Sequence, residues 1–331
     1  MERPLISFVT PMREQDFRVI GLLHSIRQQN YPQEKIEIVI VDDGSAPAVL
    51  ERCKEYGVKI VFNKEGRAEG KGRGKDIGIW ESCGKYVVIA EADISLIGKE
   101  WINRMIAPLE ESPVLFASVP KLYVKKEDHI VNRYLSYVGV DPFAAFRSLE
   151  GQLAFGRVPL EDKGSYYQVK LNPFAPYCMG SNGFMFRREL IDKVGDYAQD
   201  VEFIARLVKN GFLYFAIPKG AFVFHANVKS FRDFLKKRWR WTRDYTRFYA
   251  KEKKDFVWVT DKTNFFTYVA KNLLVFPNLF LSLKNWYKDR DQAWLLHPFF
   301  LFISTSINIW FGLMAPETVP AIFKRKDVLQ T

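Results

Sequence analysis

Short apolar runs alternate with helical patterns over the first third of the chain. Four runs are rich in β-branched and apolar residues and end at turn residues or charges, which predicts strands at residues 5–10, 36–41, 58–62 and 86–90. Between them, apolar residues recur three or four positions apart, which predicts helices at residues 17–29, 45–56 and 74–83. This alternation predicts an α/β fold with a mostly parallel sheet and helices on both faces. We also expect the folded domain to begin directly at the first strand, without a signal peptide.

The last third of the chain has a different pattern. Residues 265–283 carry one charge, Lys271, and a central Pro277, whereas residues 293–314 carry no charge. The second segment is long enough for a membrane-spanning helix. The first is a poorer candidate for a full span and suits an interfacial or re-entrant element better. Two buried core helices would have a similar composition, so spanning, interfacial and core-packed interpretations all stay open.

The net charge of +11 narrows the classes of partner. A surplus of basic residues favours an anionic partner such as a nucleic acid, a nucleotide or a membrane surface. Residues 229–254 hold eleven basic and three acidic residues, so this segment carries +8 and the rest of the chain only +3. If both apolar segments cross the membrane, this segment and the basic residues 324–326 lie on the same side, which the positive-inside rule makes the cytoplasm.

The basic segment also has helical periodicity. Its apolar residues recur on one predicted face, at Phe231, Phe234, Leu235, Trp241, Tyr245, Phe248 and Tyr249. Most of its basic residues fall on the other face, at Lys236, Lys237, Arg240, Arg243 and Arg247. This predicts a basic amphipathic helix at a membrane interface. A core-packed helix with a solvated basic face is the alternative, and nucleic-acid binding is a weaker one.

These patterns predict three parts: a catalytic domain at residues 1–228, a basic interfacial region at 229–262 and hydrophobic membrane-associated helices at 263–331. The three cysteines, Cys53, Cys83 and Cys178, are scattered. They therefore exclude a disulfide framework and a CxxC zinc site, and they fit a reducing compartment.

Acidic residues follow two of the predicted strands. Asp42 and Asp43 follow the second strand, and Glu91 and Asp93 follow the fourth. In parallel α/β sheets, ligands bind beyond the carboxyl ends of the strands, so this arrangement is typical of an active site. An Asp-Asp-Gly-Ser sequence is also common as a turn with a helix cap, which leaves that alternative open.

Three stretches resemble family 2 glycosyltransferases. Residues 7–45 have the strand, Thr-Pro turn, helix and Val-Asp-Asp-Gly-Ser end of the family's opening, and residues 72–94 end at its Asp-x-Asp position. Residues 180–212 are similar to its third block, and the match runs in order over about residues 5–250. The resemblance implies the A-type nucleotide-sugar fold and an inverting transfer from a nucleoside-diphosphate sugar, either a GDP-sugar or a UDP-sugar.

By resemblance, Asp43 contacts the nucleoside of the donor, with Asp42 beside it. Thr10 and Pro11 would form a wall of the same pocket. A carboxylate accepts hydrogen bonds from a base or a ribose hydroxyl, which suits this role. A purely structural role as a turn residue is the alternative for Asp42.

The resemblance also implies a divalent metal. Asp93 and His225 stand where family members hold Mn²⁺ or Mg²⁺, which bridges the diphosphate oxygens. Glu91 stands where Asp is usual and is expected to contact the nucleotide. Lys75 is expected to approach a phosphate, although the Gly-rich stretch at 63–75 also fits a solvated loop. A hydrogen-bonded structural histidine is the alternative for His225.

On the acceptor side, Asp200 aligns with the general base that takes the acceptor's hydroxyl proton. Gln199 departs from the usual acidic residue there. Gly180, Ser181 and Asn182 would flank the acceptor.

A second acceptor-side stretch lies in the basic segment. Arg238, Trp239, Arg240 and Trp241 resemble the Gln-x-x-Arg-Trp motif of cellulose-synthase-like members, in which Trp stacks on the acceptor and Arg meets the diphosphate. The leading Gln is absent, so the register of the motif stays open. A membrane-interface aromatic belt would explain the tryptophans equally well.

The function predicted from the sequence is an inverting, metal-dependent hexosyltransferase at the cytoplasmic face of the cell membrane. Its acceptor would be a hydroxyl of a lipid-linked saccharide or a polysaccharide, as in glycan biosynthesis. The alternative within the family is a polyprenyl (dolichyl) phosphate sugar synthase. An inactive scaffold, suggested by Glu91 and Gln199, and a nucleic-acid-binding protein are alternatives from other classes, and we expect no nucleic-acid partner.

Overall fold

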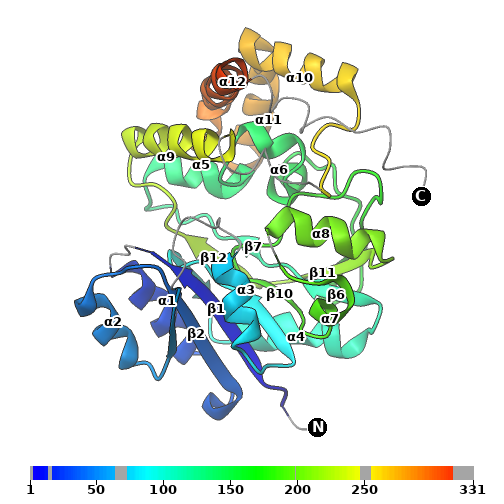
Figure 1. Ribbon diagram of the computed structural model, residues 1–331. Helices are drawn as coiled ribbons and strands as arrows, with labels where there is room; N and C mark the ends of the chain where they lie inside the picture. Colours follow the sequence, from blue (N-terminus) through cyan, green and yellow to red (C-terminus); the bar gives the residue numbers. More distant parts are fainter. Residues whose placement is uncertain (1–2, 14–16, 64–72, 198, 247–254, 316–331) are drawn as a thin grey trace. The chain divides into compact units, whose positions relative to one another are not determined.

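The computed structural model describes residues 3–13, 17–63, 73–197, 199–246 and 255–315 (Figure 1). The chain divides into two compact units. The first, here called the sheet unit, comprises Met1–Tyr123 and Val158–His225. The second, here called the helical unit, comprises Val124–Arg157 and Ala226–Thr331.

The sheet unit is built on a nine-stranded sheet, counted over the described residues, with the order β3-β2-β1-β4-β10-β6-β11-β9-β8. These strands are β1 (Ile6–Met12), β2 (Ile36–Asp42), β3 (Lys59–Phe62), β4 (Tyr86–Ile89), β6 (Leu115–Ser118), β8 (Glu161–Asp162), β9 (Tyr166–Lys170), β10 (Phe184–Arg187) and β11 (Tyr214–Pro218). The neighbours β3, β2, β1 and β4 are parallel, which makes the four strands predicted from the sequence one half of the sheet. The α/β class is confirmed. The sheet is mixed, because β10 runs antiparallel to β4 and β6, and β9 runs antiparallel to β11 and β8.

A smaller sheet has the order β5-β12-β7 and comprises β5 (Ile94–Ile97), β12 (Phe222–His225) and β7 (Lys121–Leu122). The apolar run at residues 213–224 predicts a single strand, and this prediction is wrong, because the segment forms β11 in the large sheet and most of β12 in the small one. The chain turns between them at Gly220, whose φ of +76° is accessible to glycine at little cost. The turn carries His225 into the small sheet, where it pairs with Ile94.

Helices cover both faces of the large sheet, as expected. They are α1 (Arg18–Arg27), α2 (Pro47–Lys54), α3 (Arg73–Trp80), α4 (Trp101–Glu111), α7 (Leu190–Val194) and α8 (Asp200–Lys209), with the 3-10 turn η1 (Gln33–Lys35). The face carrying Ile6 and Phe8 packs against α1, α2 and α4 in one hydrophobic core. On the opposite face, α3 lies against Val9 and Val41. Alternate residues of a strand point to opposite faces, so β1 contributes to both layers.

Within its described residues, the helical unit contains two helices before the second part of the sheet unit and four after it. They are α5 (Ile130–Val138), α6 (Leu149–Ala154), α9 (Phe231–Asp244), α10 (Lys262–Leu274), α11 (Leu279–Asp289) and α12 (His297–Met314), with the 3-10 turns η3 (Phe143–Phe146), η5 (Phe276–Asn278) and η6 (Gln292–Leu296). Tyr134, Phe234, Trp294 and Phe300 lie in its core.

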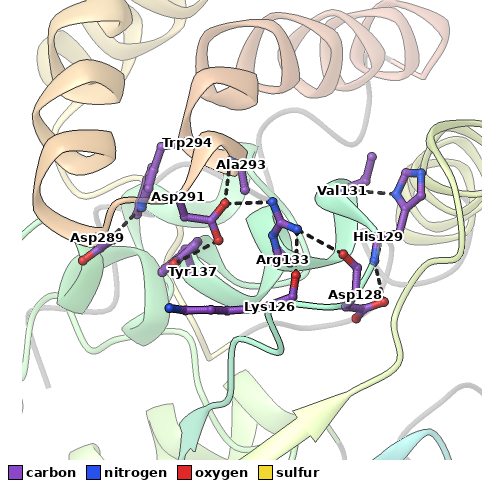
Figure 2. A network of polar contacts seen from close by, with 10 residues as sticks. All are labelled: Lys126, Asp128, His129, Val131, Arg133, Tyr137, Asp289, Asp291, Ala293 and Trp294. Carbon is purple, nitrogen blue, oxygen red and sulfur yellow. Dashed lines mark hydrogen bonds and ion pairs between the residues drawn. The ribbon is translucent and has the colours of Figure 1, made fainter.

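A polar network joins α5 to the segment between α11 and α12 within the helical unit (Figure 2). Arg133 Nη2 donates to Asp291 Oδ1 at 3.0 Å, and the Tyr137 hydroxyl donates to the other oxygen at 3.3 Å. Asp291 also caps η6 by accepting the backbone N–H of Ala293 at 2.8 Å. Trp294 Nε1 donates to Asp289 at 2.8 Å. The segment between α11 and α12 is therefore fixed to α5.

Helix α9 is basic and amphipathic, and its apolar face is only partly buried. Phe231 and Trp241 are 44% and 43% exposed, and the buried residues are Phe234, Arg238 and Thr242. Arg238 is buried because it pairs with Asp141, from the segment 124–157, at 3.0 Å. Residues 247–249 of the predicted pattern lie outside the described part of the chain.

The two apolar segments differ in shape. Gln292–Met314 is one continuous helical stretch that is long and apolar enough to cross a membrane. In contrast, α10 and the following Phe276–Asp289 pass the same test only as a pair, which is bent by 97° at the break. Length and composition are shared with core helices of soluble proteins, so the packing of the side chains has to decide between these interpretations.

The close packing of α3 on the sheet yields a first testable expectation. A Cβ at Gly78 would lie 2.4 Å from Val9 Cγ1, so Gly78→Ala forces α3 away from β1. We expect a loss of about 1–3 kcal/mol in the free energy of unfolding, which is typical of an overpacked core. Denaturant unfolding measures it. The matched control is Gly21→Ala in α1, where the new Cβ meets Ser95 Oγ at an ordinary 3.4 Å, and an equal loss in both variants would contradict the argument.

Candidate active site

The carboxyl ends of β1, β2 and β4 lie at one edge of the large sheet. The parallel register pairs Met12 with Asp42, and the backbone N–H of Asp43 donates to the Met12 carbonyl at 2.8 Å. Glu91 follows two residues after the end of β4, which pairs with β1 on its other side. The acidic residues identified in the sequence therefore share this edge, where α/β sheets bind ligands.

The two aspartates after β2 have different surroundings. Asp42 is buried, and its carboxylate accepts the backbone N–H groups of Gly44 at 3.2 Å and Ser45 at 3.1 Å, so it holds the turn together. The side chain of Asp43 is 25% exposed and lies 3.8 Å from Arg13 Nε. Asp43 is therefore better placed than Asp42 to meet a ligand, and the nucleoside-binding role of either remains a prediction.

Two residues of β1 line this edge. The buried hydroxyl of Thr10 has no hydrogen-bond partner among the described residues, which leaves it available to a ligand. Pro11 lies against α3, because a Cβ at Gly74 would be 3.1 Å from Pro11 Cβ.

A partly buried ion-pair cluster lies between α3, the segment after β4 and the start of α8. Lys75 Nζ donates to Asp200 Oδ1 at 2.6 Å and to Glu91 Oε1 at 3.0 Å. The other carboxylate oxygen of Glu91 accepts the backbone N–H of Asn182 at 2.6 Å. The cluster thus holds two carboxylates around one ammonium. It brings together four of the candidate site residues predicted from the sequence, which are Lys75, Glu91, Asn182 and Asp200.

The cluster perturbs the protonation of its members. Burial alone would lower the pKa of Lys75, but the adjacent Asp200 and Glu91 carboxylates outweigh it and raise the pKa of Lys75 above its usual range. Burial raises the pKa of Asp200, and Glu91 reinforces this while Lys75 opposes it. Lys75 is therefore cationic, and Asp200 is a stronger base than an exposed aspartate.

The loop before β10 holds Asp200 from the other side. Gly180 has a φ of +118°, and a Cβ there would lie 3.1 Å from the Asp200 carbonyl oxygen and 3.2 Å from Asp200 Cβ. The hydroxyl of the fully buried Tyr197 donates to the Gly180 carbonyl. Ser181 lies in the same loop, where its carbonyl accepts the N–H of Phe184 at 3.2 Å. Asn182 has a φ of +52°, and its buried side-chain oxygen has no hydrogen-bond partner among the described residues.

Asp93 and His225 form a second pair. Because His225 of β12 pairs with Ile94 of β5, the neighbouring Asp93 meets the imidazole, and His225 Nε2 lies 3.3 Å from Asp93 Oδ1. Arg18 Nη1 lies 3.6 Å from the other oxygen of Asp93. The described residues contain no group of three or more His, Cys, Asp and Glu side chains placed to hold a metal ion. One carboxylate and one imidazole would supply part of a site for a divalent metal, and the imidazole suits Mn²⁺ better than Mg²⁺, which prefers oxygen ligands.

The Arg-Trp stretch lies on α9 of the helical unit. Arg238 is buried in its ion pair with Asp141 and also donates to the Val140 carbonyl at 3.3 Å. Arg240, Trp239 and Trp241 are exposed. Most of the Gly-rich stretch, residues 64–72, lies outside the described part of the chain.

Sequence reasoning missed three residues that contact this site. Tyr197 holds Gly180, Arg18 lies beside Asp93 and Arg13 lies beside Asp43. The closeness of Arg13 and Arg18 to the Thr-Pro turn was a signal for the two arginines. Nothing in the sequence distinguishes Tyr197 from the aromatic residues of the core.

A model of the family described as "Glycosyl transferase family 2" matches residues 7–195, which is more than half of the chain. The chain belongs to glycosyltransferase family 2. A curated relative, 4,4'-diaponeurosporenoate glycosyltransferase of Staphylococcus aureus (strain USA300), is 25% identical over 171 residues. The alignment covers 49% of this chain and 45% of the relative, so the chain spans about half the length of the curated relatives it matches.

A solved structure shares the fold of this family 2 chain. It is the mannosyltransferase PcManGT from Pyrobaculum calidifontis in complex with GDP-Man and Mn²⁺, which is 16% identical, with a TM-score of 0.57. The superposition covers 94% of this chain and 88% of the mannosyltransferase. At this identity the likeness shows the fold alone.

The family match ends before Asp200 and His225. The structure nevertheless joins both residues to matched ones, since Asp200 pairs with Lys75 and His225 meets Asp93. The candidate site is therefore a property of the folded sheet unit, and its residues are spread over most of that unit's sequence.

The packing of Gly180 against Asp200 yields a second expectation. Gly180→Ala adds a Cβ that displaces Asp200, so we expect nucleotide-sugar turnover to fall by about a hundredfold, the usual effect of a misplacement near 1 Å. The matched control is Gly98→Ala, which has a φ of +83° and open space around the new Cβ. Both variants bear the backbone strain, but only Gly180→Ala moves Asp200. Equal turnover in the two, measured with the same donor, would contradict this role.

Proposed function

We propose that this protein is an inverting glycosyltransferase that moves a sugar from a nucleoside-diphosphate sugar to an acceptor hydroxyl. The proposal rests on two groups of side chains in the sheet unit. One is Lys75 with Asp200 and Glu91, and the other is the Asp93–His225 pair. An anion-binding lysine, a basic carboxylate and a partial metal site are the groups that such a transfer requires.

On the donor side, Asp43 would accept hydrogen bonds from the nucleoside, and the unpaired Thr10 hydroxyl and Pro11 would line its pocket. Asp93 and His225 would hold Mn²⁺ or Mg²⁺, which supplies charge stabilisation to the departing diphosphate. Arg18, 3.6 Å from Asp93, adds a positive charge there. The mannosyltransferase of the same fold was solved in complex with GDP-Man and Mn²⁺, which supports this choice of donor and metal.

On the acceptor side, Asp200 would take the proton of the attacking hydroxyl, for which its raised pKa suits it. One displacement inverts the anomeric carbon, so no carboxylate nucleophile is needed. Gly180, Ser181 and Asn182 would border the acceptor.

We further propose that the acceptor is a lipid-linked saccharide or a polysaccharide, reached at the cytoplasmic face of the cell membrane. The apolar stretch Gln292–Met314 and the basic helix α9 support this placement. The relative in Staphylococcus aureus acts, by its name, on 4,4'-diaponeurosporenoate, which also supports a membrane acceptor. In this proposal residues 1–228 are catalytic, 229–262 are interfacial and 263–331 associate with the membrane, with Arg238, Trp239, Arg240 and Trp241 on the acceptor side.

A polyprenyl phosphate sugar synthase is the second candidate. The exposed basic side chains of α9, Arg232, Lys236 and Arg240, favour it because they would attract an acceptor that is itself a phosphate. Such an acceptor hardly needs a base, which separates the two candidates experimentally.

The proposed metal site predicts a metal-dependent loss. Asp93→Ala removes one of two ligands, so we expect Mn²⁺-dependent hydrolysis or transfer across a panel of GDP- and UDP-sugars to fall by about a hundredfold or more. Chelation of the metal in the wild-type protein should have a similar effect. Asp192→Ala, at an exposed position in α7, is the matched control and should keep full activity. Wild-type activity that survives chelation would contradict the metal site, and no turnover or thermal stabilisation with any donor would contradict the proposed function.

Asp200→Asn separates the two acceptor classes. The amide keeps the shape of the side chain but cannot take a proton, so we expect transfer to a hydroxyl acceptor to fall by about a hundredfold or more. Transfer to a polyprenyl phosphate should change only mildly. Initial rates with a saccharide and with a polyprenyl phosphate measure the difference. A mild effect on transfer to the hydroxyl would show that Asp200 is not the base.

A further inference from the structure

Helices α10 and α11 have an inverted distribution of polarity, and α12, which also buries Phe300 and Leu301, presents buried polar residues as well. Asn272, Ser282, Ser304 and Thr305 are fully buried, although they are polar. Large apolar side chains are exposed instead, with exposed fractions of 64% for Leu274, 81% for Phe276, 78% for Phe280, 71% for Leu313 and 62% for Met314. Soluble domains bury such residues and leave polar ones in water. The distribution therefore indicates that the surroundings of these helices are apolar.

Polar groups at the break between α10 and α11 have hydrogen-bond partners within the protein. The side-chain amide of Asn278 donates to the Lys271 carbonyl at 3.2 Å, and it also donates to Asn272 Oδ1 at 3.2 Å. Asn272 in turn donates to Thr305 Oγ1 of α12 at 3.1 Å. Water would satisfy the end of an exposed helix, but lipid offers no partner to a free carbonyl. A bent helix pair that supplies its own polar partners fits a membrane.

We propose that α10 and α11 form a re-entrant hairpin that inserts into one leaflet of the membrane, apex first, with Phe276 and Phe280 deepest. This inference rests on the membrane-face part of the proposed function. At 1.5 Å per residue, the arms are only about 20 Å and 16 Å long. Since the apolar core of a bilayer is about 30 Å thick and the hairpin bends by 97°, neither arm crosses it.

The charges of the hairpin favour an anionic leaflet. Lys271 and Lys284 are exposed about one turn from the apex, and Lys262 and Lys288 are exposed at the far ends of the arms. These ammonium groups complement lipid phosphates, and the two near the apex keep the insertion shallow because they remain at headgroup depth. Tyr287, 66% exposed near the end of α11, suits the interface as well.

The far end of the hairpin is polar and fixed, in contrast to its apex. Asp289 and Asp291 belong to the network of Figure 2, in which Asp291 pairs with Arg133 and Asp289 accepts from Trp294. The other arm begins at Asp261, which caps α10 by accepting the N–H of Asn264 at 3.0 Å. Polarity therefore increases from the apex to the ends of both arms, as expected for a wedge that enters from one side.

The first experiment tests binding by the apex. The Phe276→Glu/Phe280→Glu variant of the full chain is compared with wild type for flotation with vesicles of equimolar phosphatidylcholine and phosphatidylglycerol. Both side chains are exposed, so we expect unchanged circular dichroism and melting, but at least a tenfold weaker vesicle affinity. The matched control, Phe62→Glu/Phe174→Glu, changes two exposed phenylalanines of the sheet unit and should bind like wild type. Wild-type binding by the apex variant would overturn the proposal.

The second experiment tests the one-sided insertion. Thr263→Cys and Lys288→Cys stand at the far ends of the two arms, and a membrane-impermeant maleimide is applied to intact cells before and after permeabilisation. A re-entrant hairpin keeps both positions on one side, so both should react under the same condition, as read on the individual peptides. Labelling of the two positions from opposite sides would show a crossing and overturn the proposal.

Donor turnover separates this inference from the proposed function. In detergent, the apex variant should keep the Mn²⁺-dependent turnover of wild type, because it leaves the sheet unit unchanged. No turnover in wild type would contradict the proposed function, whereas vesicle binding is judged by flotation alone. The proposal is wrong if wild type does not float with the vesicles and instead forms a dimer that Phe276→Glu dissociates. In that case a second copy of the chain covers the apolar face.

Discussion

The candidate site depends on one buried cation, Lys75, held between the carboxylates of Asp200 and Glu91. Two carboxylates this close repel each other and lose hydration on burial, so the ammonium is what allows both to remain in the site. Glycines allow α3 to lie directly on β1 and β2, since a Cβ at Gly78 would meet Val9 and Val41, and Lys75 projects from this helix to both carboxylates. In the proposed reaction the diphosphate is another anion for Lys75, so donor binding and the freeing of Asp200 would be linked through one side chain.

The sequence pattern predicted the parallel half of the sheet, because β1 to β4 are apolar runs bounded by turn residues and their pairing follows the alternation with helices. It did not predict the antiparallel pairing of the other half, in which β10 lies between β4 and β6 and β9 lies beside β11. These partners are far apart in the sequence, and a local pattern does not show which distant strands pair. The turn at Gly220 was also missed, and with it the pairing that brings His225 to Asp93.

The site was predictable as a list of residues and not as a set of contacts. The strand-end carboxylates and Lys75 were found from their position in the sequence, but Lys75 and Asp200 are 125 positions apart, and only the fold shows that they pair. Helix α9 illustrates a second limit. Its pattern gave no sign that Arg238 is buried, which Asp141 allows by supplying the opposite charge. Periodicity assumes that every charge faces solvent, and it fails where a partner lies about a hundred residues away.

Helices α10 and α11 reverse the assumption behind the pattern itself. Apolar side chains at helical spacing are normally assigned to a core, but here Asn272 and Ser282 are buried, whereas Phe276 and Phe280 are exposed. Composition alone treated the segment around Pro277 as a poor membrane span. The bend and the internal hydrogen bonds of Asn278 explain why the segment is a poor membrane span. A hairpin that turns back within one leaflet needs polar groups at its break and only short apolar arms. The features that weaken the segment as a span are therefore the ones that a re-entrant element requires.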